Sequence, residues 1–130
     1  MQDSQAKPKI VVADDIEMVV KLEEILLRRT GCDVFKAKDG TEALKLIQQE
    51  KPVVALLDLL MPKMNGDIVC KFVKDNPDLK DISIIMVTAR GEKEDQERSK
   101  RAGCDYFLTK PIKHNQLLDI VKKELKKKGF

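Results

Sequence analysis

The stretch VVALLDLLMPKMNG, residues 53–66, decides which fold the chain adopts. Its first five residues, 53–57, are all apolar, and a run of this kind is typical of a strand that is buried on both faces. Such strands belong to parallel sheets whose two faces are covered by helices. The run ends on a carboxylate, Asp58, and further apolar residues follow it. The sequence therefore raises the question of what a charge does at the tip of a buried strand.

Outward from this stretch, short apolar runs alternate with amphipathic segments along the whole chain. The expected strands are residues 9–13, 33–37, 53–57, 82–87 and 104–108. Apolar residues at helical spacing lie between and after them: Val19, Leu22 and Leu26; Ala43, Leu44 and Ile47; Ile68, Val69, Phe72 and Val73; Leu118, Val121 and Leu125. Asp39 followed by Glu42 predicts a capping box before the second helix. The alternation predicts an α/β fold with a doubly wound parallel sheet, in which residues 53–57 form the central strand.

The length and composition bound the class of protein. A chain of 130 residues holds one ordinary domain, so we expect a single domain over residues 1–130, with residues 1–7 as a flexible tail. The hydrophobic fraction of 42% is high enough to build a core. The net charge of +3 argues against a dedicated nucleic-acid binder. No apolar stretch approaches the roughly 18 residues of a membrane span, and the first residues lack the apolar core of a signal peptide, so we expect a cytoplasmic protein without membrane insertion.

The cysteines and the histidine offer no metal or disulfide framework. Cys32, Cys70 and Cys104 are odd in number and far apart, which fits neither a disulfide scaffold nor a zinc site. We interpret them as small core residues. His114 has no second histidine or cysteine with which to share a metal, and it is expected on the surface.

Polar residues gather where the predicted strands end. In doubly wound sheets, ligands bind outside the carboxyl ends of the strands. The residues at those ends are Asp14, Asp15, Asp58, Thr88, Lys110 and Pro111. Two carboxylates about 4 Å apart repel by roughly 4 kcal/mol at an effective dielectric near 20, so three of them favour a bound cation. Oxygen ligands of this kind suit Mg²⁺, which also accepts a phosphate oxygen.

A carboxylate beside such an ion can act as a nucleophile and form an acyl phosphate, and Asp58 is the candidate. The ammonium of Lys110 and the hydroxyl of Thr88 are suited to neutralising charge on the phosphoryl oxygens. Each residue alone has a simpler interpretation. Asp15 could cap the first helix, Asp58 could meet the following turn, Thr88 could be an ordinary strand residue and Lys110 a solvated loop lysine. Their coincidence at one edge of one sheet favours the functional interpretation.

Four motifs resemble a known family. They are VVADD (11–15), LLDLLMPKMNG (56–66), MVTA (86–89) and LTKP (108–111), which occur in order across almost the whole chain. Together they resemble the receiver domain of bacterial two-component response regulators, in particular the single-domain, chemotaxis-regulator-like members. The resemblance implies a flavodoxin-like three-layer sandwich with a five-stranded parallel sheet of order 2-1-3-4-5.

The resemblance also implies roles for individual residues. Asp58 would accept a phosphoryl group from a sensor histidine kinase or a histidine phosphotransfer protein, and the receiver would catalyse its own phosphorylation and dephosphorylation. Asp14, Asp15, Asp58 and the backbone carbonyl of Leu60 would bind Mg²⁺, with Mn²⁺ as a substitute. Thr88, Ala89 and Lys110 would contact or respond to the phosphoryl group, and the Lys110–Pro111 peptide bond would be cis. Leu60 and Arg90 would tune the lifetime of the phosphate.

In the family, an aromatic residue three positions before the lysine turns into the space that the threonine vacates. Here it is Phe107, where Tyr is common, so the hydroxyl is missing. Tyr106 should point to the opposite face of the strand. The segment EKEDQERSKRA, residues 92–102, offers Ala102 as almost its sole apolar anchor, so a helix there would be loosely held and suited to a switch. The alternative interpretation is a solvated helix face without that role. The resemblance places the output partner on the face made by this helix, the fifth strand and the last helix. The lysines at 122, 123 and 126–128 lie at a helix C-terminus with no aromatic residues among them, so we expect no direct contact with nucleic acid.

Other functions fit the residues less well. A haloacid-dehalogenase-like phosphatase needs a second aspartate two residues after the first, and that position is Leu60. A nucleotide-binding module needs a glycine-rich pattern after the first strand, where this chain has ADDIEMVV, residues 13–20. Two arrangements stay open: a standalone regulator, and a receiver excised from a longer response regulator or hybrid kinase.

Overall fold

The computed structural model describes residues 7–130, and strands and helices alternate along them as the sequence predicts. The strands are Lys9–Ala13 (β1), Asp33–Ala37 (β2), Val54–Asp58 (β3), Ser83–Thr88 (β4) and Tyr106–Thr109 (β5). The helices are Glu17–Arg28 (α1), Gly40–Glu50 (α2), Gly66–Asp75 (α3), Lys93–Ala102 (α4) and His114–Lys127 (α5). Apart from Lys7, the tail expected over residues 1–7 lies outside the described residues.

The five strands form one parallel sheet in the order β2-β1-β3-β4-β5, which confirms the predicted fold. β3 lies at the centre: Val54 is opposite Ile10 of β1 on one side and Ser83 of β4 on the other. The winding direction reverses between β1 and β3, because β2 lies on one side of β1 and the later strands lie on the other. The carboxyl ends of these two strands are therefore neighbours at the place where such sheets bind ligands.

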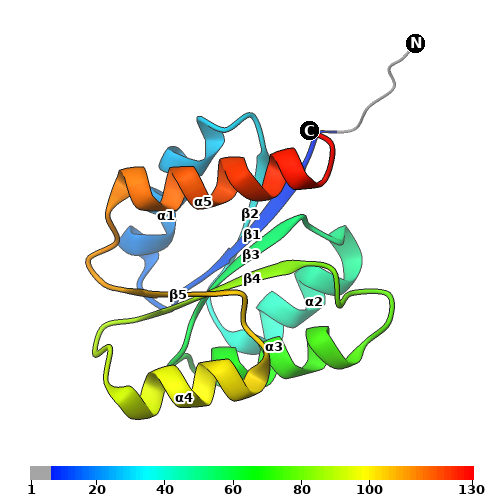
Figure 1. Cartoon of the computed structure of the whole chain (residues 1–130). Coiled ribbons are helices and arrows are strands. Elements are labelled where there is room, and N and C mark those ends of the chain that lie inside the picture. The colour runs from blue at the N-terminus through cyan, green and yellow to red at the C-terminus, as the bar shows by residue number, and fades with distance from the viewer. Residues whose placement is uncertain (1–6) are drawn as a thin grey trace.

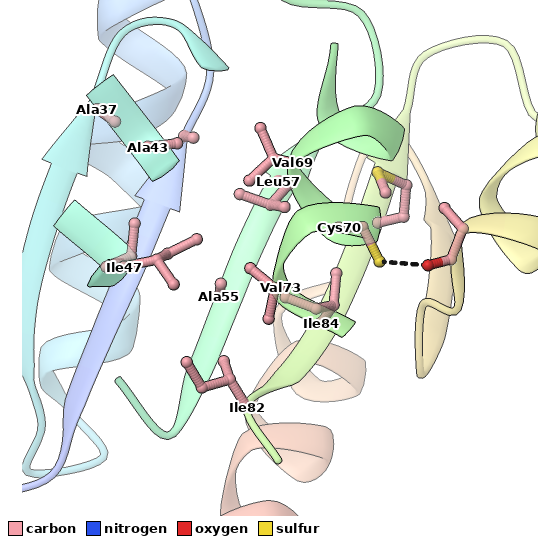
Figure 2. Packing of buried hydrophobic residues seen from close by; sticks show 14 of the residues in the cluster. Ala37, Ala43, Ile47, Ala55, Leu57, Val69, Cys70, Val73, Ile82 and Ile84 are labelled. Atoms are coloured by element: carbon pink, nitrogen blue, oxygen red, sulfur yellow. Dashed lines mark hydrogen bonds between the residues drawn. The ribbon is translucent and has the colours of Figure 1, made fainter. Parts of the chain in front are cut away.

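Helices cover both faces of the sheet and make a three-layer sandwich (Figure 1). α1 and α5 lie on one face, and α2, α3 and α4 lie on the other. Alternate strand residues point to opposite faces, so the core consists of two clusters. On β3, Leu56 packs toward α1 and α5, whereas Leu57 packs toward α2 and α3. Figure 2 shows the second cluster, where the thiol of Cys70 donates a hydrogen bond to the carbonyl of Ala102 in α4.

The bounds of β1 and β2 match the prediction, and those of β3, β4 and β5 differ from it by one or two residues. β3 and β4 each begin one residue later and include Asp58 and Thr88, because the ladder pairs Asp58 with Val87 and Thr88 with Thr109. β5 begins at Tyr106 rather than at residue 104. Just before it, the carboxylate of Asp105 accepts the N–H of Ile84 at 2.8 Å. The backbone N–H of Asp105 still donates to the carbonyl of Ile84 at 2.9 Å, so the side chain replaces only the backbone acceptor of this pair.

Three residues predicted to be on buried helix faces are exposed. Leu22 of α1 and both Ile68 and Phe72 of α3 have 59%, 45% and 54% of their surface accessible. Helical spacing identifies apolar residues that share a side of a helix, but a helix that is apolar around much of its circumference can bury only the side that faces the sheet. Cys32 and Cys70 are buried as expected, whereas Cys104 is half-buried.

The predicted helix start before α2 is confirmed. The side chain of Asp39 accepts the N–H of Glu42 at 2.8 Å, and the carboxylate of Glu42 accepts the N–H of Lys38 at 2.8 Å. The first bond satisfies a backbone donor that the first turn leaves free. The second departs from the predicted capping box, because Glu42 accepts the N–H of Lys38 rather than that of Asp39. His114 is the first residue of α5 and is exposed, as predicted.

Candidate functional site at the carboxyl edge of the sheet

Asp14 lies at the carboxyl end of β1, on the edge of the sheet where the strands end, and backbone groups on both sides hold it there. Its N–H donates to the carbonyl of Ala37 at the end of β2, and its Oδ1 accepts the N–H of Ile16 at 2.9 Å, where the chain turns into α1. The side chain is only 2% exposed. Asp15, its neighbour, is exposed and does not cap α1, since the N-cap is Ile16. The simpler interpretation of Asp15 as a helix cap was therefore wrong.

Asp58 is the last residue of β3 and is 9% exposed. The following turn brings the start of α3 against this strand end: a Cβ on Gly66 would lie 2.3 Å from the carbonyl oxygen of Asp58. Only glycine permits so close an approach. Within the turn, Asn65 Oδ1 accepts the N–H of Met61 at 3.2 Å. The turn residues thus hold the start of α3 against the backbone at the end of β3.

The three carboxylates converge, with one lysine among them. An oxygen of each of Asp14, Asp15 and Asp58 lies within 4.8 Å of the others. Lys110 Nζ donates to Asp14 Oδ2 at 2.6 Å and to Asp58 Oδ2 at 3.1 Å. One ammonium does not balance three carboxylates, so negative charge remains in excess at this edge.

The electrostatics of the edge shift the pKa values of the buried groups. Burial and then the charge of Asp14 raise the pKa of Asp58 to about 6, although Lys110 opposes this shift. Burial by itself would lower the pKa of Lys110, but the hydrogen bond to Asp14 and the charge of Asp58 outweigh it, and the pKa is raised. The ammonium therefore stays charged while Asp58 resists ionisation. A cation added to the edge would favour the carboxylate form of Asp58.

The residues fit a hard divalent cation. All the side-chain atoms that could bind the metal are carboxylate oxygens, and they come from the adjoining ends of β1 and β3. Lys110 offsets only part of the repulsion between these carboxylates. Mg²⁺ prefers oxygen ligands of this type and keeps several waters. Leu60 lies next to the site, because its backbone N–H helps to lower the pKa of the Asp58 carboxyl group.

Thr88 and Lys110 belong to the ends of the next two strands. Thr88 is buried at the end of β4, its carbonyl accepts the N–H of Lys110 at 2.8 Å, and its Oγ1 accepts the N–H of Arg90 at 3.4 Å. No hydrogen bond within residues 7–130 joins the hydroxyl of Thr88 to Asp58. Ala89 is exposed beside Thr88, and the Lys110–Pro111 peptide bond is cis.

The two aromatic residues of β5 point to opposite faces, as the alternation predicts. Phe107 is half-buried against the cluster under α2, α3 and α4. Tyr106 packs on the other side, and its hydroxyl donates to Glu124 of α5 at 2.6 Å. Tyr106 is therefore tied to α5, whereas Phe107 has no polar atom to hold it.

Three buried polar residues near this edge and along α4 were missed from the sequence. Glu23 of α1 and both Asp95 and Ser99 of α4 are buried. The signal was present for Glu23, which lies three residues after Val20 and four before Leu27, both buried on the same side of α1. Charged residues are normally assigned to the solvent side of a helix, so the apolar pattern did not single out Glu23.

The winding of the sheet and the acidic edge beside a lysine define a class of protein: a doubly wound α/β domain suited to a divalent cation and a phosphoryl group. The chain belongs to the response regulator receiver domain family, whose model matches residues 10–122. It is thus a receiver domain of two-component signalling, a phosphorylation-dependent switch. None of the helices in the described part of the chain has the length and apolar character that a membrane crossing requires.

Similar proteins agree with this assignment. Protein PilG of Pseudomonas aeruginosa is 33% identical over 114 residues, which cover 88% of this chain and 84% of PilG. The polar-differentiation response regulator DivK of Brucella anthropi is 32% identical over 116 residues, covering 89% and 94% of the two chains. The crystal structure of a putative response regulator from Chloroflexus aurantiacus superposes with a TM-score of 0.85 at 32% identity, over 92% of this chain and 98% of that chain.

Proposed function

We propose that Asp58 is the phosphoryl acceptor of this receiver and that Asp14, Asp15 and Asp58 hold Mg²⁺ together with the backbone carbonyl of Leu60. The observation that carries the proposal is the position of Lys110, whose ammonium bonds to Asp14 and Asp58 at once. In that position the ammonium stays beside Asp58 when the acyl phosphate forms, and it can pair with the new phosphoryl oxygens. Bound Mg²⁺ would supply further positive charge for those oxygens.

In this reaction an oxygen of the ionised Asp58 attacks the phosphorus of a phosphohistidine, the P–N bond breaks, and the donor imidazole leaves with the electron pair. Asp58 must be a carboxylate, since the protonated acid is a poor nucleophile. The ammonium of Lys110 favours that form. We assign Thr88 and Ala89 to the phosphoryl-responsive segment, because Thr88 ends the strand between Asp58 and Lys110.

We further propose that phosphorylation is transmitted to a protein partner on the face made by α4, β5 and α5. α4 is suited to move because the residues that it buries are Asp95, Ser99 and Ala102, so apolar packing holds it only weakly. A hollow of about 240 Å³ separates α4 from β5 and includes Phe107 in its lining. Arg90, two residues after Thr88, reaches Asp95 of α4 at 2.8 Å and links the edge to this helix.

The experiment is incubation with acetyl phosphate, with and without Mg²⁺, followed by intact-mass measurement. We expect a magnesium-dependent adduct that hydroxylamine removes in the wild type, and no adduct in Asp58→Ala. The matched control is Asp75→Asn, which removes an exposed carboxylate at the end of α3 and should label normally. Equal labelling of Asp58→Ala and wild type would refute the assignment of the acceptor.

A further inference from the structure

A second concave site borders the acceptor edge. It is a cleft of about 460 Å³ between α1, the 110–112 segment and the start of α5. Its apolar walls are Val19, Leu22, Leu26, Ile112 and Leu117. A volume of this size holds a side chain or a small molecule. None of the roles assigned above uses this cleft.

Glu23 lies in the lining of this apolar cleft. It is 8% exposed, and within residues 7–130 its carboxyl group forms no hydrogen bond or ion pair. Burial first, and then the charges of Asp14 and Asp58, raise the pKa of Glu23 to about 8, while Lys110 opposes the shift. A buried carboxyl group without a partner is costly to ionise, and it gains most from a cation that enters beside it.

The cleft is continuous with both the acceptor site and an exposed apolar surface. Lys110 lines the cleft and also bonds to Asp58, so anything seated there lies beside the acceptor. On α1, Met18, Leu22 and Ile25 are all exposed and follow one another at helical spacing. Leu22 belongs to both the stripe and the cleft. A partner helix that covers the stripe would therefore reach the mouth of the cleft.

We propose that the cleft seats a lysine or arginine side chain of the phosphodonor protein, with the aliphatic stem on the apolar walls and the cationic head at Glu23. This inference rests on the proposed function, because the donor must approach the edge where Asp58 lies. Lysine and arginine bury apolar stems while their charged heads need a partner, which matches the apolar walls and the carboxyl group of Glu23. The ammonium of Lys110 also lines the cleft, but it already bonds to Asp14 and Asp58. The adjacent Asp14 and Asp58 disfavour an anionic occupant.

The test uses two probes with the same stem. Nα-acetyl-lysine methylamide carries the ammonium, and Nα-acetyl-norleucine methylamide has the four-carbon stem without it. Each is titrated into ¹⁵N-labelled full chain with excess Mg²⁺, and amide shifts are followed. We expect saturable shifts in residues 19–26 and 110–117 for the lysine probe, with binding about tenfold weaker for the norleucine probe, as loss of a charge-assisted bond predicts.

Variants separate the cleft from the acidic edge. Glu23→Gln preserves the shape of the side chain, and it should lower the affinity for the lysine probe to that for the norleucine probe. Glu24→Gln is the matched control: it removes the same charge from the next residue of α1, which pairs with Arg28 and Lys36 outside the cleft, and should bind normally. Dispersed amide spectra verify that both variants are folded.

Three outcomes overturn the inference: no saturable shift, equal binding of the two probes, or lysine-probe binding that Glu23→Gln leaves unchanged. Shifts that centre on residues 14, 15 and 58 and persist in Glu23→Gln would place the cation at the acidic edge instead. The readout needs no phosphorylation. Failure here therefore leaves the role of Asp58 intact, and failure of the acetyl phosphate labelling does not alter this result.

Discussion

At the scale of single residues, two buried carboxyl groups differ in whether they have a bonded partner. Asp58 has Lys110 Nζ as a partner at 3.1 Å, whereas Glu23 forms no hydrogen bond or ion pair within residues 7–130. Both pKa values are raised, first by burial. A group whose pKa is higher in the folded state than in the unfolded chain adds stability at low pH and loses that contribution as the pH rises through the folded value.

Glu23→Gln should therefore stabilise the protein at alkaline pH relative to wild type. Wild type loses stability over the pH range between the ordinary pKa of 4.5 and the folded value of about 8. The variant does not, because glutamine cannot ionise. We expect the free energy of unfolding of the variant, relative to that of wild type, to rise by at least about 1 kcal/mol from pH 5 to pH 8, because proton binding and folding are linked. Urea denaturation followed by circular dichroism at the two pH values measures this difference.

Glu24→Gln should show no such gain, because hydrogen bonds from Arg28 and Lys36 lower the pKa of Glu24 and stabilise its charged form. A difference between Glu23→Gln and wild type that stays constant with pH would show that Glu23 titrates normally, contrary to its buried position.

At the scale of elements, α4 is built differently from the other helices. It buries Asp95 and Ser99 against the sheet, and within the described chain neither Asp95 Oδ2 nor Ser99 Oγ has a hydrogen-bond partner. Arg90 bonds only to the other oxygen of Asp95. A buried polar atom without a partner costs about 1–3 kcal/mol, so α4 is held less firmly than its burial suggests.

Ser99→Ala should stabilise the protein by about 1 kcal/mol, because it removes a buried hydroxyl that bonds to nothing in the described chain. The contrasting variant is Ser83→Ala, since Ser83 donates to Glu124 and accepts from Lys128 at 3.0 Å. We expect this second change to destabilise by about 1–2 kcal/mol. Chemical denaturation of the two variants checks both signs, and a loss of stability in Ser99→Ala would contradict this account of α4.

At the scale of the whole molecule, the edge brings together residues from β1, β3 and the segment after β5. Asp14 and Lys110 are 96 positions apart in the chain, yet their polar atoms are 2.6 Å apart. The cluster exists only in the folded state, so a cation that binds it must stabilise the fold.

Mg²⁺ should therefore raise the melting temperature, and a chelator should reverse the rise. At a free concentration of ten times the dissociation constant, the gain is about 1.4 kcal/mol. Asp14→Asn should lose most of this response because it removes a buried charged ligand, whereas Asp75→Asn should retain it. Thermal melts at matched ionic strength separate binding from screening, and an equal rise in all three proteins would indicate a nonspecific salt effect.

Close packing between distant loops also supports the edge. A Cβ on Gly40, at the start of α2, would lie 1.8 Å from the carbonyl oxygen of Met64 in the turn after β3. Gly40→Ala should cost more than about 2 kcal/mol, because backbone must move to admit the methyl group. Thr41→Ala, one residue later and exposed, should change stability by less than about 0.5 kcal/mol. Similar losses in the two variants would contradict the tight packing at Gly40.

Much of the fold and of the candidate edge followed from the sequence alone. Continuous apolar runs such as residues 53–57 indicate buried parallel strands, and the short motifs that end them placed Asp14, Asp15, Asp58, Thr88 and Lys110 at one edge. These features depend on local periodicity and on topology, which a parallel sheet of this winding restricts strongly. The sequence pattern therefore determined the parallel sheet and the meeting of the carboxylates, whereas the strand order came from the resemblance of the four motifs to the receiver family.

The tertiary structure alone decided which side of each helix is covered and which polar groups lose their solvent. Leu22 and Phe72 are exposed although they follow the apolar pattern, and Glu23 and Ser99 are buried although they are polar. Periodicity reports which residues share a face but not what packs against it, and the free energy of a buried polar group depends on neighbours that are distant in sequence. For that reason the cleft beside Lys110, and the carboxyl group within it, became visible only in the folded molecule.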